Sequence, residues 1–109
     1  MPTRKNATPM SDKTIAFLES ITKEKLTISN LIGSIRECEE MSQTEFAKLI
    51  GVSRQYLCDV EHGRRTVSPK LAAAWADKLG YSAEQFVRLA LQDEIEKSGL
   101  HFIVQIKAA

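Results

Sequence analysis

The stretch that most constrains the fold is residues 42–63, where two short helical patterns are separated by only two residues. Ser42 can accept a hydrogen bond from a free amide at the start of the first helix, and Glu45 can return the interaction as a capping box. Ser53 can cap the second helix in the same way. A joint this short leaves the second helix little freedom relative to the first, so the sequence predicts a helix-turn-helix.

Apolar residues at helical spacing indicate which faces of the two helices meet. They are Phe46, Ala47 and Ile50 in the first helix, and Leu57 and Val60 in the second. Ala47 is small where the two backbones would cross closely. Gly51 stands where the first helix ends, and the left-handed conformation common at such an end is easy only for glycine.

The outward face of the second helix is polar and rich in hydrogen-bonding groups. It carries Arg54, Gln55, Cys58, Asp59 and His62, with Tyr56 at its margin. Arginine and glutamine match the edges of guanine and adenine in the major groove, so Arg54 and Gln55 are candidates for base contacts. An ordinary solvated face would have a similar composition. The recognition-helix interpretation is favoured because the caps, the glycine turn and the small crossing residue all agree on one geometry.

Four short motifs then resemble the Cro/C1-type (XRE-like) helix-turn-helix family of bacterial and phage repressors. They are residues 42–47, 51–53, 61–63 and 79–80, and the resemblance covers roughly residues 31–86. It implies an all-α, lambda-repressor-like bundle of about five helices that binds operator DNA, usually as a two-fold dimer.

The resemblance also implies roles for individual residues. The implied base contacts are Arg54, Gln55 and Asp59. Gln43 matches a glutamine that touches a DNA phosphate and braces the recognition helix. Asp59 is acidic where many relatives are neutral or basic, so it either accepts a hydrogen bond from a cytosine amino group or repels phosphate and filters against wrong sequences.

Arg36 and Glu61 match a buried ion pair that ties the first helix of the domain to the third. Two exposed charges without a partner are the alternative for these residues. If the pair is buried, removal of one partner should cost on the order of 3 to 5 kcal/mol, because the other charge is left uncompensated.

A basic loop follows the recognition helix. The net charge of the whole chain is only +1, but basic residues are in excess in 51–70, whereas 82–99 is net acidic. Arg64 and Arg65 are placed to touch phosphates beside the groove, contacts that give affinity and salt dependence but little sequence information. An exposed loop with no such role is the alternative. The phosphate-contact candidates are together Gln43, Ser53, Tyr56, Arg64 and Arg65.

The remaining helices are predicted from further caps and apolar stripes. Thr27 caps a helix whose core stripe is Ile28, Leu31, Ile32 and Ile35. Ser68 and Pro69 open a helix that ends at Gly80, with Leu71, Ala74, Trp75 and Leu79 near one side. Ser82 and Gln85 form a capping box for a last helix that ends near Gly99.

A length of 109 residues, 43% of them hydrophobic, indicates one domain with a modest core and little room for an enzyme cleft. We expect an unstructured arm over 1–10, an added helix over 11–25, the DNA-binding domain over 26–99 and a dimerisation strand over 100–109. The arm could instead reach into a minor groove. It contains no apolar run, so it is neither a signal peptide nor a membrane span, and a cytoplasmic location is expected.

The end of the chain is β-branched and apolar, with Phe102, Val104 and Ile106 on one face, which predicts a strand over 101–106. A lone strand leaves its backbone groups unpaired, so it must pair with a second copy or with a different protein. Self-pairing is simpler, because it also yields a dimer with recognition helices about 34 Å apart. A disordered end is the alternative.

No motif for catalysis occurs, and no cofactor is expected. Cys58 and His62 are four residues apart on a helix, but a zinc site needs roughly three or four ligands and no other residue is spaced to join them. Two functions therefore remain. One is a dimeric repressor or regulator of a palindromic operator. The other is the antitoxin of a toxin-antitoxin pair, whose added helix or C-terminal strand binds a toxin while the helix-turn-helix represses their shared promoter.

Overall fold

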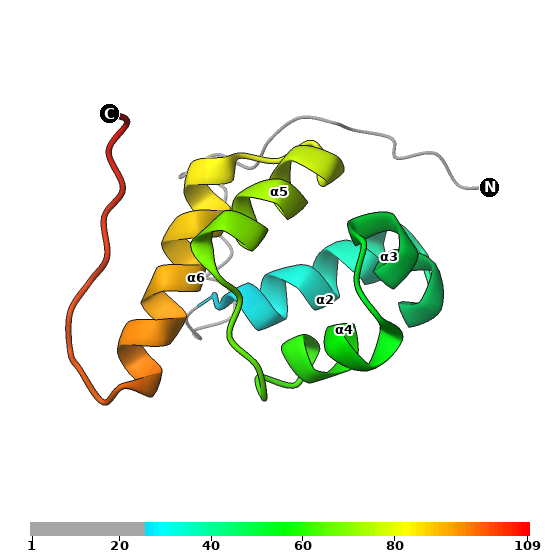
Figure 1. Ribbon diagram of the computed structural model, residues 1–109, viewed down its shortest axis with the longest axis horizontal. Helices are drawn as coiled ribbons and strands as arrows, with labels where there is room; N and C mark the ends of the chain where they lie inside the picture. The colour runs from blue at the N-terminus through cyan, green and yellow to red at the C-terminus, as the bar shows by residue number, and fades with distance from the viewer. Residues whose placement is uncertain (1–25) are drawn as a thin grey trace.

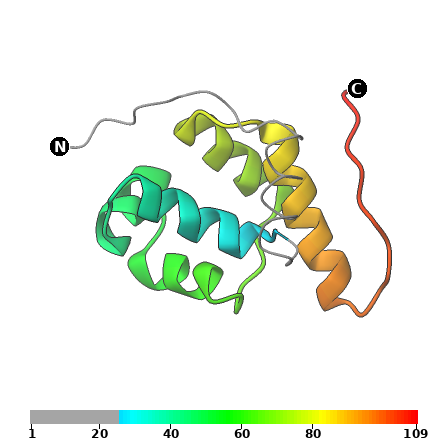
Figure 2. The ribbon, with the colours of Figure 1, turned by 180° about the vertical axis from the view of Figure 1, so that it is seen from behind.

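The structure is a computed structural model that describes residues 26–109. Within that range the chain forms five helices, α2 (Ile28–Cys38), α3 (Gln43–Ile50), α4 (Arg54–Glu61), α5 (Pro69–Leu79) and α6 (Ala83–Lys97). Helix α2 runs through the middle of the bundle between α4 and α5, with α3 near one end and α6 near the other (Figures 1 and 2). The all-α class is confirmed. The arm expected over 1–10 and the added helix expected over 11–25 lie outside the described residues.

Four of the helices begin at the caps that the sequence predicted. The hydroxyls of Thr27, Ser42, Ser53 and Ser68 each accept a hydrogen bond from the backbone N–H three residues on, at 3.0–3.2 Å. The capping box of Ser42 with Glu45 is complete. Gly51 and Gly80 end α3 and α5 in the left-handed conformation, with φ angles of 79° and 78°. These local predictions are confirmed because each depends on only a few neighbouring residues.

The start of α6 differs from the prediction. Ser82 makes no side-chain cap hydrogen bond, and the Gln85 side-chain oxygen instead accepts from Arg88 Nε at 3.3 Å. The capping box expected there is therefore wrong. Tyr81 stacks on Phe86, with ring centroids 6.0 Å apart, across the first turn of the helix. This contact is a hydrophobic staple, which fixes the entry of the chain by packing rather than by a hydroxyl.

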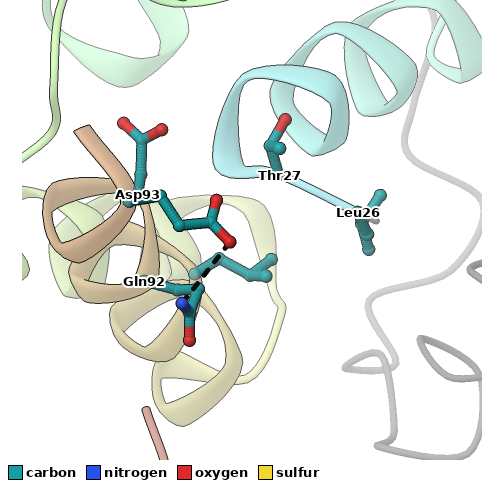
Figure 3. A pocket seen from close by; sticks show the side chains of 6 residues that line it. Leu26, Thr27, Gln92 and Asp93 are labelled. Carbon is teal, nitrogen blue, oxygen red and sulfur yellow. Dashed lines mark hydrogen bonds between the residues drawn. The ribbon is translucent and has the colours of Figure 1, made fainter. Parts of the chain in front are cut away.

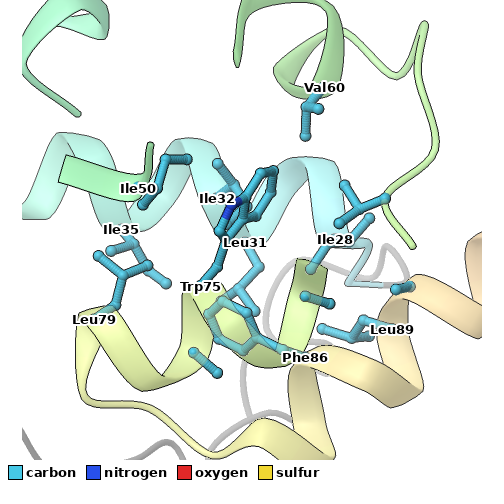
Figure 4. Close-up of a cluster of buried hydrophobic side chains, with 14 of the residues drawn as sticks. Ile28, Leu31, Ile32, Ile35, Ile50, Val60, Trp75, Leu79, Phe86 and Leu89 are labelled. Carbon is cyan, nitrogen blue, oxygen red and sulfur yellow. The ribbon is translucent and has the colours of Figure 1, made fainter. Parts of the chain in front are cut away.

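The helices bury one apolar core (Figure 4). Trp75 lies at its centre with no exposed surface, as expected for the single tryptophan of a small bundle. In α5 the buried face includes Ala72 and Ala76. Ala74, which was expected on that face, is exposed. The expected stripe was therefore wrong at Ala74, because the side of α5 that faces the core carries Ala72, Trp75, Ala76 and Leu79.

Glu40, directly after α2, is the one non-glycine residue with a positive φ, 55°, among residues 26–109. This backbone conformation is unfavourable for any residue with a Cβ atom. We expect Glu40→Gly to raise the free energy of unfolding by about 0.5 to 1 kcal/mol, because the relief of strain exceeds the entropy that glycine adds to the unfolded chain. Glu39→Gly removes the same charge at a φ of −83° and should not stabilise. Urea denaturation of both variants tests this, and equal midpoints would contradict it.

The last ten residues, 100–109, are called the tail below. The strand predicted over 101–106 is not present, because the tail has no regular secondary structure. It runs back beside α6 on the outer side of the bundle (Figures 1 and 2). A ladder needs a second strand, and the described part of the chain has none. Phe102 is 63% exposed, whereas Val104 and Ile106 are half-buried.

Candidate nucleic-acid interface

Helix α4 is held by packing on one side and is open on the other. Leu57 and Val60 have no exposed surface, and Ala47 of α3 is 2% exposed where the two helices pack together. Arg54 and Gln55 are exposed on the first turn of α4. The joint at Gly51 therefore places both candidate base-contacting side chains on the surface, at the N-terminal end of a helix whose opposite side is anchored in the core.

Asp59 is at the centre of a hydrogen-bonded group on the outward face of α4. Its Oδ1 atom accepts from Gln55 Nε2 at 3.1 Å and from Arg64 Nε at 3.1 Å. A second guanidinium nitrogen of Arg64 lies 3.0 Å from the same oxygen. The bond from Arg64 holds the pKa of the Asp59 carboxyl below its usual value, and the bond from Gln55 acts in the same direction. Asp59 therefore remains charged at neutral pH and orients both neighbours.

Arg65 is placed by an aromatic ring rather than by a carboxylate. Its guanidinium carbon lies 4.6 Å from the centroid of the Tyr56 ring. Tyr56 in turn meets the buried Trp75 edge to face, with centroids 6.3 Å apart. The contact between the cation and the ring is worth about 0.5 to 1 kcal/mol at an exposed site. It holds Arg65 against α4, although nothing in the spacing of the sequence indicated this contact.

Arg36 and Glu61 join three helices. Arg36 Nε donates to Glu61 Oε2 at 2.8 Å, and a terminal nitrogen of Arg36 donates to Glu61 Oε1 at 3.0 Å. The other terminal nitrogen donates to the Met41 carbonyl at 3.0 Å. Gln43 Nε2 completes the network with a 3.4 Å bond to Glu61 Oε1. The side chains of Arg36 and Glu61 are only 19% and 10% exposed. Each charge is therefore compensated mainly by the other charge rather than by water.

Gln43 is the first residue of α3, and Ser53 is the N-cap of α4. Ser53 is exposed and Gln43 is half-buried. One polar atom of each is used within the protein, because Gln43 Nε2 donates to Glu61 and the Ser53 hydroxyl accepts from the Tyr56 N–H. The network and the cap hold α3 and α4 in a fixed relation.

Cys58 and His62 bond locally. His62 Nδ1 lies 2.8 Å from the Cys58 carbonyl oxygen and 3.5 Å from the Cys58 sulfur. Among residues 26–109, no three His, Cys, Asp or Glu side chains are grouped so that they could hold a metal ion. Over the same residues, no helix combines the length and the apolar character needed to cross a bilayer.

A family model described as helix-turn-helix matches residues 32–86, a range that runs from α2 to the first turn of α6 and contains α3, the turn and α4. No curated protein and no solved structure gives a significant match to the chain.

Proposed function

The chain belongs to the Cro/C1-type (XRE-like) helix-turn-helix family of DNA-binding transcriptional regulators, and on that premise we propose that it is a repressor that binds a palindromic operator as a homodimer. The observation that carries this proposal is the pair Arg54 and Gln55, exposed on the first turn of a helix whose other face is fully buried. A helix held in this way can enter the major groove with its N-terminal residues toward the bases. The protein would act in the cytoplasm, and no catalytic step is part of the proposal.

Base contacts are assigned to Arg54, Gln55 and Asp59. The fork of Arg54 suits the two acceptors of guanine. Gln55 suits adenine even while it is bonded to Asp59, because an amide nitrogen carries two hydrogens. One hydrogen can stay on Asp59 and the other can reach the adenine ring nitrogen, while the Gln55 oxygen accepts from the adenine amino group. Asp59 then orients Gln55 and also has acceptor capacity left for a cytosine amino group.

Phosphate contacts are assigned to Gln43, Ser53, Tyr56, Arg64 and Arg65. The support is their position around α4 and the fixed side chains of the two arginines, one on Asp59 and one on Tyr56. Because ordered side chains lose less entropy on binding, arginines placed in advance should bind the DNA backbone more tightly than free ones.

Arg64→Ala should weaken binding to all DNA sequences about equally and lower the salt slope by about one, because one phosphate contact is lost. Asp59→Asn is the matched opposite change, since it removes a negative charge beside the phosphates, an effect that outweighs the loss of the bond that orders Arg64. It should raise affinity for random DNA and reduce the preference for the operator. Binding isotherms over a range of salt concentrations measure both effects. Unchanged slopes in both variants would mean that this loop does not meet phosphates.

The dimer is assigned to Phe102, Val104 and Ile106. Two exposed, apolar tails offer the surface that a two-fold interface requires. The test of the whole proposal is selection of bound DNA from a random pool. We expect a palindrome whose half-sites are spaced by about 10 to 10.5 base pairs or a multiple. A single asymmetric site, or no enrichment, would contradict it.

A second candidate, the antitoxin, is favoured by the exposure of Leu100, Phe102 and Ile103, at 46%, 63% and 73%. This apolar surface could bind a different protein instead of a second copy. Coexpression with the product of a neighbouring gene distinguishes the two functions. A toxic neighbour that becomes harmless when this chain is present, but not when residues 100–109 are deleted, would establish the antitoxin.

A further inference from the structure

Gln92 of α6 holds the tail through a pair of short hydrogen bonds. Its Nε2 donates to the Phe102 carbonyl at 2.8 Å, and its Oε1 accepts from the Val104 N–H at 2.8 Å. The side chain is only 4% exposed. Figure 3 shows it on α6, with the longer 3.5 Å bond to Glu96 dashed, beside a small hollow between α6 and the start of α2. A buried amide with both ends on the backbone of one segment is a specific attachment.

Gln92 donates one hydrogen bond to the tail backbone and accepts one from it, as the backbone of a neighbouring strand would. In an extended segment, the backbone groups of residues 102 and 104 point to one side, and those of 103 and 105 point to the other. Gln92 occupies the first side. No residue of 26–109 bonds to the backbone of Ile103 or Gln105, and both residues are exposed. The tail thus has one edge held by Gln92 at two backbone groups and one edge free.

We propose that Gln92 is a positioning residue that holds the tail as a ready-made edge strand, and that the free edge pairs antiparallel with the same edge of a second copy. This rests on the dimer of the proposed function and specifies how it forms. Because Gln92 already orders the tail in the single chain, less conformational entropy is lost when two copies associate. The free edge also suits a copy of itself, since each chain brings the same row of donors and acceptors.

The attachment also restricts the register of pairing. Only odd-numbered residues present backbone groups at the free edge, so odd residues must face odd residues across the interface. A two-fold axis at Val104 pairs all four of 101, 103, 105 and 107 with a partner. An axis at Ile103 would bring in Gly99, whose φ of 78° is not extended, and an axis at Gln105 would place Phe102 opposite the small Ala108. With the axis at Val104, Phe102 faces Ile106 of the other copy, which is a favourable aromatic and β-branched pair.

The register can be tested without changing Gln92. In the full chain with Cys38→Ser and Cys58→Ser, Val104→Cys should form a disulfide-linked dimer under mild oxidation, because a residue at the axis faces its own copy in the close, non-hydrogen-bonded arrangement. Ile103→Cys is the control, since Ile103 is more exposed but does not face itself. Faster cross-linking at 103, or no cross-link at either position, would overturn this register, and a dimer that persists when residues 100–109 are deleted would overturn the pairing of the tails.

The role of Gln92 is tested by Gln92→Ala, with Glu94→Ala, an exposed position of the same helix, as the control. Sedimentation should show a dimer dissociation constant raised at least about tenfold by the first variant and unchanged by the second, because only the first frees the tail. A thermal melt of Gln92→Ala checks that the domain is folded, and Gln92→Glu, which accepts but cannot donate, should also weaken the dimer. An unchanged dissociation constant would overturn the role of Gln92. A chain that stays monomeric yet selects an operator half-site would overturn the pairing and leave DNA binding intact.

Discussion

Arg36→Met and Glu61→Leu are each expected to lower the free energy of unfolding by about 2 to 4 kcal/mol, because each leaves one charge of a largely buried pair without its partner. The estimate is somewhat below that for a fully buried pair, since the two side chains are 19% and 10% exposed. Glu61→Leu also removes the acceptor of Gln43. Helix α4 would then lose its polar attachment to both α2 and α3.

The double variant Arg36→Met with Glu61→Leu is the decisive control. With both charges gone, the apolar replacements can pack against each other, and most of the lost stability should return. Urea denaturation of the four proteins at neutral pH gives the coupling energy directly. If each single variant lies within about 0.5 kcal/mol of the original chain, the pair behaves like an exposed surface ion pair and does not hold α4 in place.

Removal of both proposed base contacts, Arg54→Ala with Gln55→Ala, is expected to weaken operator binding by about 2 to 6 kcal/mol, because each good base contact contributes about 1 to 3 kcal/mol of discrimination. The fold should be unaffected, since both side chains are exposed and neither belongs to the core. Affinity for random DNA should fall far less. The ratio of operator to random binding is therefore the informative measurement.

The single variant Gln55→Ala sharpens this test. In a selection from random DNA it should lose preference at one base pair of each half-site while the other positions keep theirs. Gln105→Ala changes an exposed glutamine in the tail instead and should leave every preference intact. A Gln55→Ala protein that selects the original operator would remove Gln55 from base recognition and leave the family assignment as it stands.

The interface could be predicted only in part, and Asp59 shows why. Its spacing from Gln55 along α4 allowed their contact, because residues four apart share a helix face. Its ion pair with Arg64 depends on how the chain turns after Gly63, whose φ is 71°. The position of Arg65 over the Tyr56 ring likewise depends on Trp75 of another helix, which meets that ring edge to face.

The sequence by itself determined the four helix caps, the glycine turn and the exposed start of α4, because each rests on a few consecutive residues and on the geometry of one helical turn. The tertiary structure alone decided that Tyr81 and Phe86 replace a capping box at α6, and that Gln92 holds the tail where a strand was expected. These outcomes depend on which surfaces meet in space. A strand is stable only when a second backbone pairs with it, and in residues 26–109 a side-chain amide stands in that place.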